Sequence, residues 1–165
     1  ASVAGGAGIS VESRTPSTSA TSQFDVVFNF SAAATSGTAT IQSCVVSTGP
    51  ASSAACTSNP VAGTVVFNGT TATVPLTGIT NQSRVLVRLG NVNGSGLNAE
   101  VAIGFLIGDV TGNGSVSATD ATQVSLRNGQ TVTSTNARYD VTANGGTINA
   151  TDATQTSIRV GTRLP

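Results

Sequence analysis

The 165-residue sequence contains no His, Met, Trp or Lys, and its seven basic residues are all Arg. Without His the chain lacks the usual general base and the commonest transition-metal ligand, and without Lys it cannot form a Schiff base. Seven acidic residues balance the seven Arg, so the formal net charge is zero and no basic surface is expected. The composition argues against nucleic-acid binding and against most familiar enzyme mechanisms.

Long hydrophobic runs are also absent. Pure apolar runs such as residues 26–28 are far shorter than the roughly 18 to 20 residues that cross a bilayer. The chain starts with Ala1 instead of Met, as expected of a mature chain whose secretory signal has been removed. We therefore expect an extracellular protein, either soluble or assembled at the cell surface.

Only two cysteines occur, Cys44 and Cys56, with Gly49 and Pro50 between them. A redox or metal pair would need CxxC spacing or further ligands, and neither is present. In an oxidising compartment the pair is expected to form a disulfide, which would stabilise the fold by about 3 kcal/mol on the chain-entropy model.

From residue 8 to about residue 107, short alternating or β-branched runs are separated by Gly, Pro, Asn and Ser. This pattern is typical of a β-sandwich, and no helix is favoured in the region. About seven strands are expected, at residues 8–14, 24–30, 38–46, 63–67, 71–76, 84–92 and 100–107.

The clearest strand, residues 24–30, places three of the five Phe residues and Val26 on one face. Asn68-Gly69 predicts a hairpin turn between the fourth and fifth expected strands. Pro75 falls inside a strand pattern and predicts an edge strand or a bulge, because proline has no N–H for the ladder.

An internal repeat marks the end of the chain. Residues 118–129 (ATDATQVSLRNG) and 150–161 (ATDATQTSIRVG) are identical at nine of twelve positions. Each copy follows an acidic loop that contains Asn-Gly, and the loops start at Asp109 and Asp140. Such duplication predicts two copies of one structural unit.

The first loop, from Asp109 to Asp120, has the spacing of a Ca²⁺ loop: oxygen side chains at positions 1, 3, 5 and 12, Gly at position 6 and a carbonyl at position 7. Four of the seven carboxylates of the chain occupy the first and last positions of the two loops. The alternative is a pair of solvated Asx turns with helix N-caps at Asp120 and Asp152. The apolar residues at position 8, Val116 and Ile148, are expected to pair and join the loops.

With these motifs, residues 108–165 resemble a type I dockerin, a tandem of Ca²⁺-binding loop-helix units. The resemblance implies two Ca²⁺ ions, each held by side-chain oxygens and one main-chain carbonyl. The implied first-site ligands are Asp109, Thr111, Asn113, the Ser115 carbonyl and Asp120, and the second-site ligands are Asp140, Thr142, Asn144, the Gly146 or Thr147 carbonyl, and Asp152.

Three features depart from the family. Thr stands at position 3, where the family usually has Asn or Asp, and Asn stands at position 5, where it often has Asp. Each loop therefore offers two formal negative charges, which predicts weak binding suited to millimolar extracellular Ca²⁺. The second loop is also one residue longer than the first.

The two helices that follow the loops have thin apolar faces, and helices this short need support from Ca²⁺, from each other or from another domain. The expected faces are Ala121, Val124 and Leu126 in the first helix, and Ala153, Thr156 and Ile158 in the second. In the family this module binds a cohesin, itself a β-sandwich, through loop positions 10 and 11 and the helix that follows. The corresponding residues are Ala118, Thr119, Ala150 and Thr151, with Arg127 and Arg159 further along the helices.

The predicted fold is mainly β: an immunoglobulin-like or cohesin-like sandwich in residues 1–107 and a small α-helical dockerin-like module in residues 108–165. The preferred function is a secreted, non-enzymatic subunit of an extracellular filament, in which the module docks head-to-tail on the sandwich of a neighbouring copy. The alternative is a module that binds a separate cohesin, with the sandwich as spacer or carbohydrate-binding domain. The lack of Trp and the single Tyr argue against sugar stacking.

Catalysis is the weakest hypothesis. A glycosidase needs two carboxylates across a cleft, and outside the loops only Glu12, Asp25 and Glu100 remain.

Overall fold

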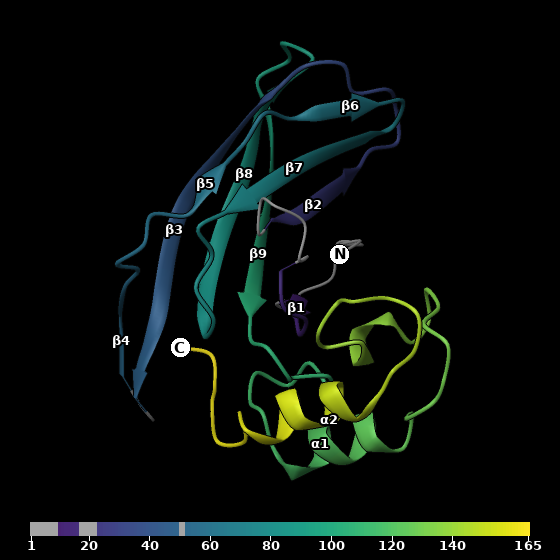
Figure 1. Cartoon of the computed structure of the whole chain (residues 1–165). Helices are drawn as coiled ribbons and strands as arrows, with labels where there is room; N and C mark the ends of the chain where they lie inside the picture. Colours follow the sequence, from purple (N-terminus) through teal and green to yellow (C-terminus); the bar gives the residue numbers. More distant parts are fainter. Residues whose placement is uncertain (1–9, 17–22, 50–51) are drawn as a thin grey trace.

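Two β-sheets and a small helical unit make up the protein in a computed structural model, which describes residues 10–16, 23–49 and 52–165 (Figure 1). One sheet has the strand order β1-β9-β8-β3-β4, and the other has the order β2-β7-β5 with β6 also paired to β7. The strands are β1 (Ser10–Glu12), β2 (Phe24–Asn29), β3 (Thr38–Gly49), β4 (Ser52–Ala55), β5 (Val61–Ala62), β6 (Val66–Asn68), β7 (Thr71–Thr77), β8 (Ser83–Val92) and β9 (Leu97–Phe105).

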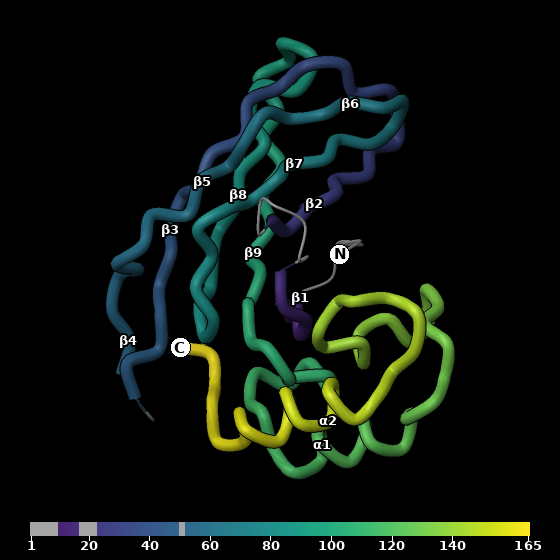
Figure 2. The backbone as a smooth tube through the Cα atoms, viewed as in Figure 1, coloured from purple at the N-terminus to yellow at the C-terminus, as the bar shows by residue number. Residues whose placement is uncertain are grey.

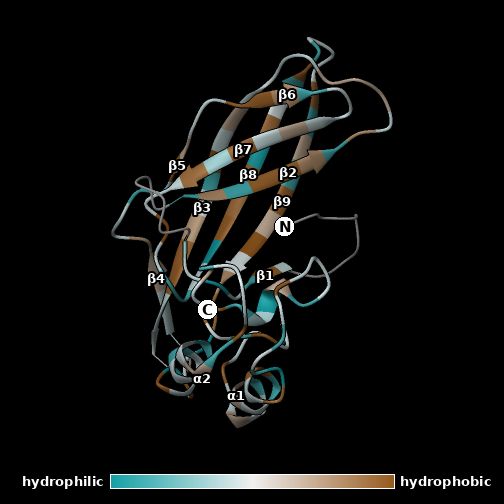
Figure 3. Ribbon diagram, turned by 45° about the vertical axis from the view of Figure 1, so that its right-hand side comes forward, coloured by the Kyte–Doolittle hydropathy of each residue, from teal (hydrophilic) through white to brown (hydrophobic). Residues whose placement is uncertain are grey.

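The core lies between the two sheets. Alternate residues of β7 and β8 point inward and are completely or almost completely buried: Ala72, Val74, Leu76, Val85, Val87 and Leu89. The predicted Phe face is confirmed, because Val26 and Phe28 of β2 join this core and Phe24 and Phe30 pack against it. Figure 3 shows apolar residues, in brown, alternating with more polar ones along the strands of both sheets.

The predicted fold class is confirmed, since the chain is mainly β and its two α-helices lie near the C-terminal end. The expected number of about seven strands is too low, because nine strands occur among the described residues. The additional strands include β4, made of Ser and Ala, and β5, only two residues long, so neither has a β-branched run. The first two residues of the expected strand at 8–14 lie outside the described residues.

The edge-strand prediction for Pro75 is wrong, because β7 lies between β2 on one side and β5 and β6 on the other. The Pro75 carbonyl accepts a hydrogen bond from the Gly63 N–H at 2.8 Å, in the stretch between β5 and β6. The carbonyl and nitrogen of one residue in an antiparallel strand face the same side. The Pro75 nitrogen, which has no hydrogen to donate, therefore faces the gap between β5 and β6. No continuous partner strand needs a donor at this point.

Two local predictions in the sandwich are confirmed. Asn68 pairs with Thr71 across a hairpin, and Gly69 has a φ of 58°, the left-handed conformation that a tight hairpin turn needs. Cys44 of β3 and Cys56, which follows β4, form a disulfide with a Cα–Cα distance of 5.4 Å. The disulfide fastens the edge strand β4 to β3.

The helical unit consists of α1 (Ala118–Ser125), the short 3₁₀-helix η1 (Ala137–Tyr139) and α2 (Ala150–Ser157). The α-helices begin at capping boxes in which Ser117 and Asn149 are the N-caps. Asp120 and Asp152 are the third residues of the helices, where each carboxylate accepts the N–H of its cap residue. The alternative that placed N-caps at these two Asp residues is thus wrong.

The expected pairing of Val116 with Ile148 is wrong. The Val116 carbonyl accepts from the Gly161 N–H, and the Val116 N–H donates to the Thr162 carbonyl. Gly161 and Thr162 both follow α2. Ile148 makes the equivalent bonds with Gly129 and Gln130, which follow α1. Each loop therefore pairs with the segment after the helix of the other repeat, and Figure 2 shows the two repeats wrapped around each other.

The C-terminal module (residues 108–165) packs against one end of the sandwich. Leu106 shares a small buried cluster with Val116 and Leu164, and Ile107 packs against a second cluster that contains Val110 and Val141. The domain boundary expected after residue 107 remains a prediction. No α-helix among the described residues is long and apolar enough to cross a membrane.

Candidate calcium loops and docking face

The first loop encloses two fully buried carboxylates, those of Asp109 and Asp120. Asp109, at the start of the loop, accepts main-chain hydrogen bonds at both oxygens. Oδ1 accepts from Gly112 at 2.8 Å and from Asn113 at 3.2 Å, and Oδ2 accepts from Gly114 at 2.7 Å. The turn of the loop therefore folds around the Asp109 side chain.

Asp120 accepts four hydrogen bonds. Its Oδ1 accepts from the N–H and the hydroxyl of Thr111, and its Oδ2 from the N–H and the hydroxyl of Ser117, all at 2.8 to 2.9 Å. Burial raises the pKa of Asp120, but these donors outweigh it and the pKa is lowered. The carboxylate is therefore held in its ionised form.

The two carboxylates converge on the Thr111 hydroxyl. Its oxygen lies 2.9 Å from Asp120 Oδ1 and 3.3 Å from Asp109 Oδ1. The first, third and twelfth positions of the loop, which the sequence predicts as ligands, are thus together in space. Asn113, at the fifth position, uses its side-chain oxygen to accept from the N–H and hydroxyl of Ser115.

These residues fit a Ca²⁺ ion. Asp109 and Asp120 have no salt-bridge partner, because the ion pairs found among the described residues are Arg14–Glu12 and Arg88–Glu100. Two buried carboxylates that converge without an ion-pair partner are costly, and a bound cation would offset that cost. The side chains at the predicted ligand positions all offer oxygen atoms, which hard cations such as Ca²⁺ prefer.

No cluster of three or more His, Cys, Asp or Glu side chains occurs within residues 10–16, 23–49 and 52–165. Neutral oxygens of Thr, Asn and the main chain would therefore complete the coordination. The ligand sets implied by the resemblance remain predictions.

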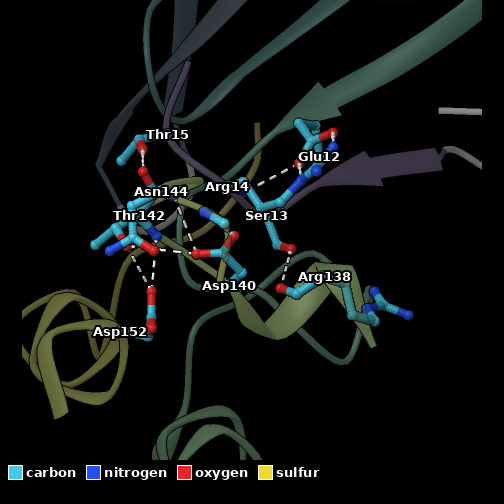
Figure 4. A network of polar contacts seen from close by, with 10 residues as sticks. Glu12, Ser13, Arg14, Thr15, Arg138, Asp140, Thr142, Asn144 and Asp152 are labelled. Carbon is cyan, nitrogen blue, oxygen red and sulfur yellow. Dashed lines mark hydrogen bonds and ion pairs between the residues drawn. The ribbon is translucent and has the colours of Figure 1, made fainter. Parts of the chain in front are cut away.

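The second loop repeats this arrangement (Figure 4). Asp152 Oδ1 accepts from the Thr142 N–H at 2.9 Å and from its hydroxyl at 2.8 Å, and Oδ2 accepts from the Asn149 N–H at 2.9 Å. Asp140 accepts from the N–H groups of Asn144 and Gly145. Both Asp side chains are buried.

The extra residue of the second loop is Gly146. Thr147 corresponds to Ser115, because each directly precedes the apolar position 8 and each forms an isolated β-bridge, with Thr131 and Arg163 respectively. The Gly146 carbonyl accepts from the Val132 N–H at 2.8 Å. Of the two carbonyls left open by the sequence, that of Thr147 is therefore the structural counterpart of the Ser115 carbonyl.

The helix faces differ from the prediction at one position in each repeat. Val124 and Thr156 are fully buried, as expected, but Leu126 and Ile158 are 69% and 68% exposed. The helical turn of 3.6 residues explains this, since positions two residues apart lie on different faces. Ala118, Thr119, Ala150 and Thr151 are also exposed.

Arg127 and Arg159 are half-buried and held against their own module. The Arg127 guanidinium lies 3.7 Å from the centroid of the Tyr139 ring and donates to Gln123. Arg159 donates in the same way to Gln155. A partner-contact role for these two Arg residues remains a prediction.

Sequence reasoning placed Leu126 and Ile158 on the apolar helix faces and missed their exposure. The signal was present in the repeat, where both copies keep a large aliphatic residue at this position.

The carboxylates outside the loops all have partners. Glu12 pairs with Arg14, Glu100 pairs with Arg88, and Asp25 accepts from Gln23. Glu12 and Asp25 line one pocket, and the non-enzymatic interpretation of the sandwich remains a prediction.

A comparison with protein-family profiles matches residues 107–157 to the dockerin type I domain. Searches of curated proteins and of solved structures found no match. The match covers about a third of the chain and supports the resemblance for this stretch alone. Dockerins bind Ca²⁺ in their loops and dock to protein partners, typically cohesins, so Ca²⁺ binding and protein docking are supported for residues 107–157.

Proposed function

We propose that this protein is a secreted, non-enzymatic docking protein whose C-terminal module binds the β-sandwich of a cohesin-like partner. The docking face consists of the exposed residues Ala118, Thr119 and Leu126 of the first repeat and Ala150, Thr151 and Ile158 of the second. The β-sandwich of this chain acts as the spacer that carries the module.

The observation that carries this proposal is the exposure of Leu126 and Ile158 at equivalent positions of the two repeats. Leu126 and Ile158 are the C-cap residues of α1 and α2, and each lies seven residues after Thr119 or Thr151, on the same side of its helix. A protein interface needs such an exposed apolar anchor surrounded by polar groups. A groove of about 390 Å³ between the helices, lined by small residues such as Ala150 and Ala153, extends the face.

Ca²⁺ would be held by Asp109, Thr111, Asn113, Asp120 and the Ser115 carbonyl in the first loop, with the equivalent residues in the second. When bound, the ion neutralises the buried carboxylates. The short helices α1 and α2 start at the ends of these loops. Ca²⁺ binding that orders the loops would therefore fix the positions of both helices and of the docking face.

The disulfide between Cys44 and Cys56 supports an oxidising compartment, because such bonds persist in oxidising surroundings. Dockerins occur in extracellular assemblies, which agrees with secretion. A head-to-tail filament of this chain remains the alternative, in which the docked sandwich belongs to a second copy.

The test is Ca²⁺-dependent binding of the full chain to a panel of recombinant type I cohesin domains, measured by biolayer interferometry. We expect at least one cohesin to bind in 2 mM Ca²⁺ and not in EGTA. The double variant Leu126→Ser/Ile158→Ser should weaken that binding by on the order of a thousandfold, since each of the two buried anchors contributes about 2 kcal/mol. Val66→Ser, which changes an equally exposed aliphatic residue on β6, is the matched control.

Sedimentation velocity of the chain alone, in the same two buffers, separates the alternatives. A monomer together with cohesin binding supports the proposal. Ca²⁺-dependent polymers that the Leu126→Ser/Ile158→Ser variant abolishes would replace it with the filament. A monomer that binds no cohesin in the panel would overturn it.

A further inference from the structure

The chain immediately after β1 crosses from the sandwich to the second loop. We call this segment, residues 13–15, the β1 extension. Figure 4 shows it between β9 and the loop that contains Asp140 and Thr142. It comes from the opposite end of the sequence, about 125 residues away from the residues that it contacts.

The β1 extension donates hydrogen bonds to three main-chain carbonyls in and just before the second loop. The Ser13 hydroxyl donates to the Arg138 carbonyl at 3.0 Å, and the Thr15 N–H donates to the Val141 carbonyl at 2.7 Å. The Thr15 hydroxyl donates to the Thr142 carbonyl at 2.9 Å. These carbonyls enclose Asp140 and include that of Thr142, so the bonds hold the main chain that carries the first and third ligand positions.

The same segment is fastened to the sandwich. Strand β1 pairs in parallel with β9, with Ser10 opposite Ile103 and Glu12 opposite Phe105. The Leu106 N–H donates to the Glu12 carbonyl at 3.0 Å, and the Gly108 N–H donates to the Ser13 carbonyl at 2.8 Å. Ser13 is 1% exposed, so its contact with Arg138 is shielded from water.

The first loop is held by a different segment. The Leu164 N–H donates to the Gly114 carbonyl at 2.9 Å, and Val116 exchanges two main-chain bonds with Gly161 and Thr162. The second loop has the equivalent pairing, since Ile148 bonds Gly129 and Gln130 and the Gly146 carbonyl accepts from Val132. Among the described residues, the β1 extension is thus an additional support that bonds the second loop region and has no counterpart within the first loop.

We propose that Ser13 and Thr15 are positioning residues of the second Ca²⁺ site, so that its affinity depends on the docked β1 strand whereas that of the first site does not. This inference depends on the proposed Ca²⁺ binding by both loops. Groups that orient ligands from outside the coordination sphere change metal affinity by about ten- to a hundredfold. The sandwich and the second loop would then form one thermodynamic unit, in which Ca²⁺ at the second site stabilises β1 and docked β1 favours Ca²⁺ binding.

The experiment is a Ca²⁺ titration of the full chain followed by ¹H–¹⁵N NMR, with the Gly114 amide reporting the first loop and the Gly145 amide the second. Each N–H donates to the first Asp of its own loop, so it senses an ion bound there. In Ser13→Ala/Thr15→Val, we expect the midpoint for Gly145 to rise by about tenfold and that for Gly114 to stay within twofold.

Thr15→Ser keeps the hydroxyl and should restore most of the wild-type Gly145 midpoint, which mere loss of packing would not predict. Thr40→Val/Ser43→Ala on β3 makes the same types of change at exposed residues and should move neither midpoint. If Ser13→Ala/Thr15→Val disturbs the sandwich spectrum, Thr15→Val alone is titrated instead.

Two results would overturn the proposal while leaving Ca²⁺ binding intact: equal midpoint changes at both loops, or no change at Gly145. A wild-type protein in which neither glycine amide responds to Ca²⁺ would overturn the Ca²⁺ sites themselves and this coupling with them. The two failures are therefore distinguishable.

Discussion

Leu164 packs directly on Gly104, and a Cβ at Gly104 would overlap the Leu164 side chain. Gly104 belongs to β9 of the sandwich, whereas Leu164 is the penultimate residue and shares a buried cluster with Leu106 and Val116. Because the Leu164 N–H also bonds the Gly114 carbonyl, this contact ties the first loop to the sandwich. The absence of a side chain at residue 104 is what permits the close approach.

Replacement of Gly104 by valine should therefore displace Leu164 and lower the free energy of unfolding by about 2 kcal/mol, the usual cost of overpacking. Urea denaturation in the presence of Ca²⁺ measures this change in the free energy of unfolding. Leu164→Ala alone should cost about 2 to 3 kcal/mol through the cavity that it leaves. In the double variant the clash is gone, so the two losses should be clearly less than additive; simple additivity would contradict the proposed contact.

Ala143 adopts a φ of 52°, which is unfavourable for a residue with a Cβ, whereas its counterpart in the first loop is Gly112 with a φ of 74°. Ala143→Gly should stabilise the protein by about 0.5 to 1 kcal/mol, because relief of the strain exceeds the added entropy of the unfolded chain. Gly112→Ala should destabilise it by about 1 to 2 kcal/mol. Thermal unfolding of both variants measures the two changes in stability. Changes of the same sign would contradict the prediction.

Acid should weaken the contact of Glu12 with Arg14 in β1 and its extension. Burial raises the pKa of Glu12, but hydrogen bonds and attraction from the Arg14 guanidinium outweigh it, so the pKa in the folded state is lowered. A lowered folded-state pKa means that the stabilisation is present above the ordinary Glu pKa and is lost as pH falls through the lowered value.

The variant Glu12→Gln should consequently be less stable than wild type by on the order of 1 kcal/mol at pH 7, with the difference shrinking as the pH falls below the ordinary Glu pKa. Urea denaturation of both proteins at several pH values measures this difference, and the other carboxylates cancel in it. Glu100→Gln changes a much more exposed ion pair and should show a smaller pH-dependent difference. A constant gap between wild type and Glu12→Gln at all pH values would contradict the assigned cause.

Local patterns in the sequence predict those parts of the structure that depend on neighbouring residues. The Phe face of residues 24–30, the Asn68-Gly69 turn and the loop carboxylates all follow from spacing along the chain. The exposure of Leu126 could have been predicted in the same way from the helical period, because Val124 two residues earlier faces the core.

Contacts between distant segments could not be predicted in this way. The partner of Val116 is Thr162 and not Ile148, because each loop pairs with the end of the other repeat. The bonds of Ser13 and Thr15 to the second loop bring together opposite ends of the chain. Both follow from tertiary packing, and a single sequence contains no periodicity that reports it.

The Thr111 hydroxyl lies between the carboxylates of Asp109 and Asp120, where a third acidic residue would add charge to the first loop. Thr111→Asp should raise Ca²⁺ affinity of that loop by about tenfold, because affinity in such loops depends on the number of charged ligands. Without Ca²⁺ the same change should lower stability by about 1 to 2 kcal/mol, since the hydrogen bond of the Thr111 hydroxyl is replaced by repulsion between the new carboxylate and the buried carboxylates of Asp109 and Asp120.

Calorimetric Ca²⁺ titration and urea denaturation in EGTA measure these two effects of Thr111→Asp separately. Ser125→Asp adds the same charge at an exposed residue at the end of α1 and should leave Ca²⁺ affinity nearly unchanged. An increase in Ca²⁺ affinity together with a loss of stability in the Ca²⁺-free protein identifies a residue in the site. A substitution outside the site would not have both effects. Unchanged Ca²⁺ affinity in Thr111→Asp would show that residue 111 does not face the ion.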